Sequence, residues 1–339
     1  MAKKLKVGII GAGRIGKVHA ENLAFRVPEA QIVAIADPRL EAAQDVAARC
    51  GIPQATSDYQ AILADRQIEA VLICSSTDTH AQIIEEATAV KKHIFCEKPI
   101  AHSLKKIDAA LAAVEKAGVK LQIGFNRRFD PNFARARKAV VSGEIGDVHM
   151  LHIISRDPAP PPVSYIKVSG GIFLDMTIHD FDMVRFLVGS EVEEIYTLAG
   201  VMVDPAIGEA GDLDTALVTL RFANGVIGTI DNSRKAVYGY DQRVEIFGTK
   251  GAIQTLNNYP NNAVVSGAET IHRDLPLNFF MERYTESFVN EMQAFIKAVV
   301  NDQPTPVTGV DGRIPVVMGL AARKSYDEHR PVKLSEIKP

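Results

Sequence analysis

An α/β architecture with two domains is predicted for this 339-residue chain. The first third of the sequence alternates short apolar runs with helical patterns, and a glycine-rich turn joins the first run to the first helix. The middle of the chain carries successive strand patterns without helices between them. Strand–helix alternation is typical of a parallel, doubly wound sheet, whereas successive strands indicate an antiparallel or mixed sheet. The length also favours two domains over one.

The first domain is expected to span residues 1–125. Its strand candidates are short apolar runs, namely Lys6–Ile10, Gln31–Ala36, Ala70–Cys74, His93–Cys96 and Lys120–Gly124. The helical patterns between them are rich in Ala, Leu and Glu, namely Gly16–Phe25, Leu40–Arg49, His80–Val90 and Leu104–Ala117. Right-handed crossovers bring the carboxyl ends of such strands to one edge, so ligands are expected to bind there.

The second domain is expected to span residues 126–339 and to be of α+β type, with the option that its C-terminal helix packs back on the first domain. Its strand candidates are Val148–Ile154, Val192–Val203, Thr215–Phe222, Val226–Asp231, Arg243–Phe247 and Ala252–Thr255. Asn224-Gly225 and Lys250-Gly251 mark tight turns between strands. The proline-rich segment Asp157–Val163 is predicted to be a loop, and Met281–Val300 has helical periodicity.

Composition and charge exclude several classes of protein. The chain is 47% hydrophobic and 23% charged, with a net charge of −3, which argues against a nucleic-acid binder. No run of 18 apolar residues indicates a membrane span, and Met1–Lys6 is interpreted as mature sequence rather than a signal peptide. Cys50, Cys74 and Cys96 lack metal-ligand spacing, so we expect reduced thiols in a cytoplasmic protein and no metal site.

A glycine fingerprint follows the first strand. Gly11, Gly13 and Gly16 have the spacing that permits a tight turn, close approach of a pyrophosphate, and packing of the next helix on the strand. The helix N-terminus then offers unpaired N–H groups to the phosphates. Because the fingerprint stands between a strand and a helix, we predict a dinucleotide site that includes Arg14 and Ile15 of the same turn.

Asp37 ends the second predicted strand, at roughly the 20-residue offset expected for a ribose-binding acid. A carboxylate there accepts from the ribose 2′-hydroxyl and repels a 2′-phosphate, which favours NAD over NADP. Arg39 qualifies the preference, since it can stack on the adenine or tolerate a phosphate, and NADP stays as a weaker alternative. The other interpretation of Asp37 is a helix cap or turn former ahead of Pro38.

Hydroxyl groups follow the third predicted strand. Ser75, Thr77 and His80 are interpreted as cofactor neighbours, because polar residues at the carboxyl end of a strand can line the nucleotide. The alternative is that Thr79 or Asp78 of the same segment caps the next helix.

Glu97-Lys98-Pro99 ends another strand of the same sheet and therefore reaches the same edge. A partly desolvated lysine close to the nicotinamide could hydrogen-bond the reacting oxygen of a substrate. Glu97 and Lys98 are predicted to contact the cofactor. The alternative is a surface lysine paired with Glu97.

The segment Gly170–Asp182 carries a carboxylate and a histidine. Asp175 and His179 are four residues apart, which would place them on one face of a helix. Histidine titrates near pH ~6.5 and can take a hydroxyl proton at neutral pH, and Asp175 could orient the imidazole or bind a hydroxyl. The alternatives are a helix cap and a structural histidine, and a zinc site is poorly supported because no second well-spaced ligand pair is present.

The glycine fingerprint, Glu97-Lys98-Pro99 and the Gly170–Asp182 segment together resemble the glucose–fructose oxidoreductase/inositol dehydrogenase (Gfo/Idh/MocA) family over nearly the whole chain. Gly124–Asp130 and Ser155–Pro162 resemble its bacterial inositol 2-dehydrogenase branch. The resemblance implies a Rossmann domain and a C-terminal domain with a large open, mostly antiparallel sheet whose exposed face makes a homodimer or homotetramer.

The resemblance also implies NAD(P)-dependent oxidation of a ring hydroxyl to a ketone. Lys98, Asp175 and His179 fall on the family's catalytic lysine, aspartate and histidine, and the same three residues would contact the substrate. Arg127, Asp157 and Tyr240 match polyol-contacting positions, although a pair of surface cations (Arg127 with Arg128) and a strand-edge tyrosine are the alternatives. The leading hypothesis is oxidation of myo-inositol. The others are a different cyclitol, an aldose such as glucose, and a regulator that senses NAD(H) without turnover.

Overall fold

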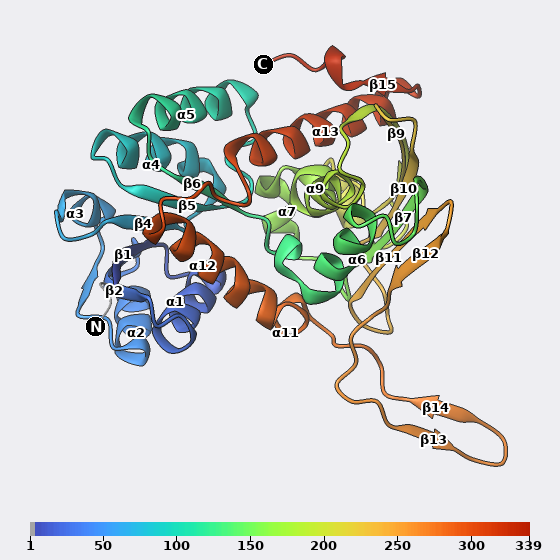
Figure 1. The fold of residues 1–339 in the computed structure, drawn as a ribbon, viewed down its shortest axis with the longest axis horizontal. Helices are drawn as coiled ribbons and strands as arrows, with labels where there is room; N and C mark the ends of the chain where they lie inside the picture. The colour runs from blue at the N-terminus through green and yellow to red at the C-terminus, as the bar shows by residue number, and fades with distance from the viewer. Residues whose placement is uncertain (1–3) are drawn as a thin grey trace. The chain divides into compact units, whose positions relative to one another are not determined.

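The computed structural model describes residues 4–339, so the predicted mature start at Met1–Lys3 lies outside the described residues. The chain divides into two compact units. The first holds the residues up to Phe129 together with Glu286–Ile314 and Pro339, and the second holds Asp130–Thr285 and Pro315–Lys338. Figure 1 shows the elements of both units with their labels.

A parallel sheet forms the centre of the first unit and confirms the predicted doubly wound architecture. Within the described chain its order is β3-β2-β1-β4-β5-β6, with every neighbouring pair parallel. The strands are β1 (Leu5–Ile10), β2 (Ala30–Ala36), β3 (Gln54–Thr56), β4 (Ala70–Ile73), β5 (His93–Glu97) and β6 (Leu121–Gly124). The helices between them are α1 (Arg14–Arg26), α2 (Leu40–Cys50), α3 (Tyr59–Ala64), α4 (Thr77–Ala89) and α5 (Leu104–Ala117).

One face of this sheet packs on α1, α2 and a helix from far along the chain, α12 (Thr285–Val300). Met292, Phe295 and Ile296 of α12 are buried in the same apolar cluster as Val7 and Phe95 of the strands. Residues 286–314 therefore belong to the first unit and not to the second, because their apolar side chains complete the core under β1 and β5.

A mixed, mostly antiparallel sheet forms the second unit and confirms the predicted α+β type. Its order is β12-β11-β7-β10-β9-β8-β15 among the described residues, and β7–β10 is the parallel pair. The strands are β7 (Val148–Arg156), β8 (Val192–Gly200), β9 (Thr215–Phe222), β10 (Ile227–Ser233), β11 (Asp241–Gly248), β12 (Gly251–Thr255) and β15 (Val332–Lys333). A separate hairpin joins β13 (Val264–Ser266) to β14 (Ile271–Arg273).

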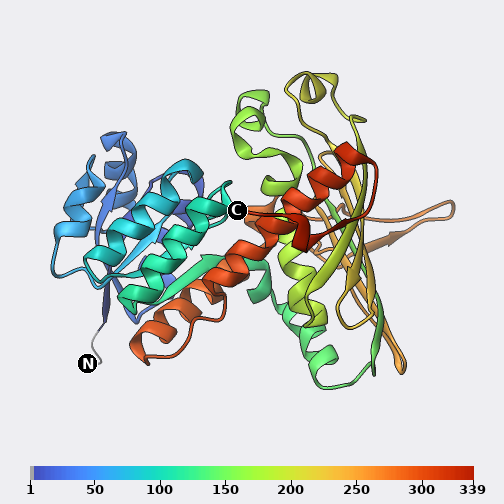
Figure 2. The ribbon, with the colours of Figure 1, turned by 90° about the horizontal axis from the view of Figure 1, so that it is seen from above.

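The main helices of the second unit cover one face of its sheet (Figure 2). The helices of this part of the chain are α6 (Pro131–Val141), α7 (Val163–Ser169), α8 (Gly171–Asp175), α9 (Thr177–Val188), α10 (Pro205–Glu209), α11 (Phe280–Arg283) and α13 (Gly309–Glu328), with the 3₁₀ turns η1 (Asn126–Phe129) and η2 (Leu334–Glu336). Residues 309–314 of α13 and all of η1 belong to the first unit. The predicted helix Met281–Val300 is divided at Tyr284 into α11 and α12.

Candidate active site

The glycine turn between β1 and α1 has the geometry of a phosphate cradle. Gly11 has φ +106° and lies so close to β4 that an added Cβ would stand 2.5 Å from the carbonyl carbon of Cys74. A Cβ added at Gly16 would lie 2.0 Å from the oxygen of Gly11, so this glycine lets α1 pack on the turn. At Gly13 an added Cβ would meet no described atom within 4 Å, which leaves open space directly in front of the N-terminus of α1.

Asp37 lies beside this cradle at the end of β2. One carboxylate oxygen accepts from the backbone N–H of Ala12 at 2.9 Å, and the other accepts from the N–H of Arg39 at 2.9 Å. A carboxylate has about four acceptor positions, so these two bonds leave capacity for ribose hydroxyls. The Arg39 side chain is largely exposed, with its Nε 3.8 Å from Asp37.

The segment after β4 is held mainly by its own side chains. The hydroxyls of Ser75 and Thr79 lie 2.7 Å apart, and Thr79 also donates to the carbonyl of Ser76. Thr77 begins α4 at this edge. His80 is fully buried, with its ring nitrogens 2.9 Å from the carbonyl oxygen of Pro99 and 3.0 Å from that of Ser75.

The ring of His80, predicted as a cofactor neighbour, is thus engaged by two backbone carbonyls. Burial lowers the pKa of His80, although hydrogen bonds to the two carbonyls oppose the shift. A neutral ring can donate to only one of these carbonyls. The His80 ring therefore holds together the segments that follow β4 and β5, at the edge where Ser75 and Thr77 also lie.

Glu97 and Lys98 end β5 at the same edge of the sheet. Glu97 accepts a hydrogen bond from His19 Nε2 of α1 at 2.7 Å, and it pairs in register with Gly124 of β6. Lys98 is partly exposed and precedes Pro99 through a cis peptide bond. The Glu97 carboxylate is bound by a buried histidine.

Arg127 also belongs to the first unit, in the turn η1. Its side chain is buried, with 4% of its surface exposed, so the alternative of a surface cation does not hold. Its neighbour Arg128 forms an ion pair with Asp311 at 2.9 Å.

Asp175 is anchored in the second unit by two side chains. Tyr165 donates its hydroxyl to one oxygen at 2.9 Å, and the buried Arg234 donates to the other at 3.2 Å. Arg234 also bonds Asp212 at 3.3 Å, and Asp212 accepts from the N–H of Ile172 at the start of α8. The carboxyl group of Asp175 is therefore held at the end of α8 by two hydrogen bonds.

Asp175 and His179 do not share one continuous helix, which corrects the prediction. Met176 ends α8 and precedes α9, with φ −97° and ψ −61°. His179 is the third residue of α9, and its N–H donates to the carbonyl of Met176 at 3.3 Å. Behind it the buried Asp180 accepts from Asn232, which also accepts from Thr177, so the first turn of α9 is tied to β10.

Asp157 lies directly after β7, next to the same end of β10. Its N–H donates to the carbonyl of Ser233 at 2.9 Å, and its carbonyl accepts from the N–H of Ala236 at 2.7 Å. Arg234, which holds Asp175, stands between these two partners in sequence. Asp157 and Asp175 are thus positioned by the same short segment after β10. Tyr240 is mostly buried and packs edge-to-face on Tyr284 at 6.0 Å.

The predicted site residues are divided between the units: Lys98 and Arg127 in the first, and Asp157, Asp175, His179 and Tyr240 in the second. Their supporting partners Arg234, Tyr165 and His19 were not indicated by the sequence. Each is an isolated residue outside any motif, and only the fold brings it to its partner.

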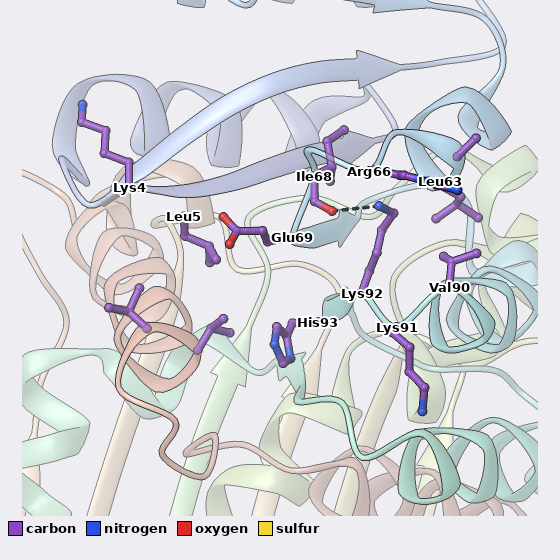
Figure 3. Close-up of a pocket in the computed structure, with 13 residues that line it drawn as sticks. Lys4, Leu5, Leu63, Arg66, Ile68, Glu69, Val90, Lys91, Lys92 and His93 are labelled. Atoms are coloured by element: carbon purple, nitrogen blue, oxygen red, sulfur yellow. Dashed lines mark hydrogen bonds between the residues drawn. The ribbon is translucent and has the colours of Figure 1, made fainter. Parts of the chain in front are cut away.

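A cavity of the first unit lies at the other end of the parallel strands, where β1 and β5 begin. It has a volume of about 860 Å³ and is bordered by cationic and apolar side chains (Figure 3). Lys92 donates to the carbonyls of Asp65 and Ile68, and burial lowers its pKa. The Lys92 ammonium group is therefore bound by backbone carbonyls, and the cavity lies at the end of the strands opposite the glycine turn.

Comparison with known proteins identifies the family. A model described as an oxidoreductase family with an NAD-binding Rossmann fold matches residues 5–125, and a GFO/IDH/MocA C-terminal domain model matches residues 133–254. The chain belongs to the Gfo/Idh/MocA oxidoreductase family.

Individual members of the Gfo/Idh/MocA family match almost end to end. The chain is 48% identical to a myo-inositol 2-dehydrogenase of Thermotoga maritima, covering 98% of this chain and 99% of the relative. It is 45% identical to an inositol 2-dehydrogenase of Rhizobium meliloti, with 98% and 99% covered. A scyllo-inositol dehydrogenase of Lactobacillus casei, solved with NAD(H) and scyllo-inositol, matches with TM-score 0.92 at 30% identity, covering 98% of this chain and 100% of that one.

NAD is the cofactor that this Gfo/Idh/MocA chain takes, as predicted. The NAD-binding family model covers the glycine turn and Asp37, and the open space at Gly13 fits a pyrophosphate. Among residues 4–339, no helix combines the length and the apolar character needed to cross a bilayer.

Proposed function

We propose that this chain oxidises the C2 hydroxyl of myo-inositol to 2-keto-myo-inositol (scyllo-inosose), with NAD⁺ as the hydride acceptor. The observation that carries the proposal is the anchored carboxylate of Asp175, held by Arg234 and Tyr165 four residues before His179 in the sequence. A fixed carboxylate beside a histidine suits removal of a hydroxyl proton. Full-length similarity to inositol dehydrogenases supports the cyclitol as substrate.

In this proposal His179 takes the proton of the reacting hydroxyl, and Lys98 donates a hydrogen bond to the oxygen as negative charge develops on it. Asp175 orients the imidazole or accepts from a substrate hydroxyl. Bound NAD⁺ supplies the hydride acceptor, cradled by Gly11, Gly13 and Gly16 with Arg14 and Ile15, and by Asp37 and Arg39 at the ribose.

Arg127, Asp157 and Tyr240 are proposed to bind the remaining hydroxyls of the cyclitol. A polyol needs several donors and acceptors, and these residues offer a guanidinium, a carboxylate and a phenol. The backbone bonds of Asp157 to Ser233 and Ala236 support this role, because they fix the position from which its carboxylate extends.

A homodimer or homotetramer in the cytoplasm is also proposed. The face of the second-unit sheet opposite its helices carries one exposed apolar side chain on each of five adjacent strands, namely Phe247, Met150, Ile227, Leu217 and Leu198. Each exposes 43–57% of its surface. Phe247, Met150 and Ile227 are in register, so they form a continuous row across β11, β7 and β10. A contiguous apolar row of this kind favours burial against a second copy.

The catalytic assignment is tested with Lys98→Ala and His179→Ala. Each variant is expected to lose about 10²–10⁴-fold in kcat with myo-inositol while it still binds NAD⁺. Turnover is followed by NADH absorbance, and nucleotide binding is measured by calorimetry. Lys105→Ala and His272→Ala, which change exposed side chains away from the motifs, serve as matched controls. A near-normal kcat in either test variant would show that the assignment is wrong.

A substrate panel decides between myo-inositol and the other polyols. The similarity to a scyllo-inositol dehydrogenase makes scyllo-inositol the second candidate, and chiro-inositol and glucose complete the panel. The highest kcat/KM is expected with myo-inositol. An enzyme that binds NAD(H) but reduces no NAD⁺ with any member of the panel would instead support a nucleotide-sensing regulator.

A further inference from the structure

Three titratable side chains meet inside the first unit, beneath the edge where β5 ends. They are His19 of α1, Glu97 of β5 and Glu291 of α12, and their ligand-type atoms all lie within 4.8 Å of one another. His19 and Glu291 are fully buried, whereas the Glu97 side chain keeps 12% of its surface exposed. The cluster therefore reaches the surface through Glu97.

His19 fixes one oxygen of Glu97. Its Nε2 lies 2.7 Å from Glu97 Oε1, while its Nδ1 has no hydrogen-bond partner among the described residues. The ring stands edge-on to Phe95 and Phe288, with centroids 5.1 and 5.8 Å away. Since a buried N–H without an acceptor is costly, the N–H belongs on Nε2, from which it donates to Glu97.

The strand beside Glu97 makes room for its other oxygen. Glu97 pairs in register with Gly124 of β6, and a Cβ added at Gly124 would lie 2.9 Å from Glu97 Oε2. A larger residue at this position would displace the carboxylate. Glycine at position 124 and the His19 bond thus define one location for the Glu97 carboxylate.

Glu291 has a different environment. Neither of its carboxyl oxygens has a hydrogen-bond partner within the described chain, and its side chain is wholly enclosed. Its backbone carbonyl is held by the buried Gln122 at 3.1 Å. Burial, reinforced by the negative charge of Glu97, holds the pKa of Glu291 well above its usual value. An unpaired carboxylate is too costly in such a place, so Glu291 is a neutral acid.

We propose that this cluster confines a single negative charge to Glu97 and that the charge favours binding of NAD⁺ over NADH. The inference rests on the proposed function, which places the nicotinamide beside Glu97-Lys98. The nicotinamide ring is positive when oxidised and neutral when reduced, so a fixed carboxylate at this edge attracts only the oxidised form. In this proposal Glu291 is an uncharged neighbour of Glu97, and His19 holds the Glu97 carboxylate in position.

The test is the ratio of the Kd values for NADH and NAD⁺, measured without polyol by calorimetry and nucleotide fluorescence. Glu97→Gln is expected to weaken NAD⁺ binding about tenfold and to change NADH binding by less than about twofold. Equal changes for both nucleotides, or none, would overturn the proposal. Failure of the unmodified protein to bind either nucleotide would overturn it together with the proposed function, whereas absence of inositol turnover alone would affect only the latter.

Glu291→Gln is the matched variant, because an amide replaces a neutral carboxylic acid of the same shape. It should leave both Kd values unchanged, and a shift in their ratio like that of Glu97→Gln would contradict a neutral Glu291. Infrared spectroscopy gives a measurement that does not depend on the Glu97 variant. The carbonyl band of a protonated carboxyl should be present near pH 7 and missing in Glu291→Gln. Absence of the band, or a stoichiometric metal ion found by elemental analysis of the unmodified protein, would refute the assignment.

Discussion

For Asp37, one role could be predicted from the sequence, and a second role is seen only in the structure. Its spacing from the glycine turn predicts a ribose ligand, and the structure adds that the same carboxylate accepts from the N–H of Ala12. The residue therefore supports the glycine turn in addition to its proposed contact with the ribose. Removing its charge should affect both nucleotide choice and the order of the turn.

Replacing Asp37 by Ala should lower kcat/KM with NAD⁺ by about tenfold or more and reduce the preference for NAD⁺ over NADP⁺. The reason is that the acceptor for the 2′-hydroxyl and the repulsion of a 2′-phosphate disappear together. Steady-state kinetics with both nucleotides provide the measurement. Asp37→Asn, which keeps one oxygen acceptor, is the control for the Ala12 bond. A stronger preference for NAD⁺ in Asp37→Ala would contradict the role assigned to the carboxylate.

Candidate site residues within motifs could be proposed from the sequence, whereas the residues that hold them by hydrogen bonds could not. Lys98, Asp175 and His179 lie in short segments whose residue types suggest chemistry. Arg234 lies 59 residues from Asp175 and carries no local pattern, so only the fold reveals that it holds the carboxylate. His80 is the opposite case, since a polar residue at a strand end suggested nucleotide contact and tertiary packing buried it.

Long apolar strands and helices of the chain were predictable because each has a clear period and a turn at its ends. Short elements were not. β3 and α3 have only three and six residues, too few for a pattern to stand out. The break at Met176 was also hidden, since the hydroxyl of Thr177, directly after it, donates to the carbonyl of Ile172 and to the side chain of Asn232 in β10. Tertiary partners set that boundary, and periodicity does not record them.

The start of β9 offers a stability test within the second unit. Asp214 is buried and accepts from the N–H groups of Met202, Val203 and Asp204. Burial by itself would raise the pKa of Asp214, but these backbone bonds and Thr215 lower it overall. The stabilisation that the ionised carboxylate gives is therefore present above the unfolded pKa and is lost as pH falls through the folded one.

Asp214→Asn should lower the free energy of unfolding by about 1–3 kcal/mol near pH 7, since an amide cannot accept all of these bonds. The difference from the unmodified protein should shrink as pH falls below the unfolded value of 3.8. Urea unfolding at several pH values measures it, with Glu209→Gln, an exposed carboxylate nearby, as the control. A difference that grows on acidification would contradict the direction of the pKa shift.

The molecule as a whole consists of two units, and they differ in how many faces of the sheet are covered by helices. The first covers both faces of its parallel sheet with helices, whereas the second leaves one face of its mixed sheet without helices (Figure 2). The row Phe247–Met150–Ile227 lies on that uncovered face. Its apolar surface is the basis for the proposed assembly into dimers or tetramers.

Charging this row should disrupt the assembly. Met150→Asp and Ile227→Asp place carboxylates at the centre of the proposed contact, where desolvation would oppose association. Light scattering after size exclusion is expected to show a smaller species than the unmodified protein. Phe25→Asp, which charges an exposed apolar residue of α1 in the first unit, should leave the mass unchanged. An unaltered mass in both sheet variants would exclude this face as the interface.

The position of α12 in the core of the first unit affects how the protein folds during translation. When a ribosome has released residues 4–129, the strands and the glycine turn exist, but Met292, Phe295 and Ile296 are not yet made. Part of the apolar face of the nascent sheet stays exposed while residues 130–285, the larger part of the second unit, are translated. The nucleotide-binding unit, although it comes first in the chain, is therefore completed only after residues 130–285 of the second unit have been made.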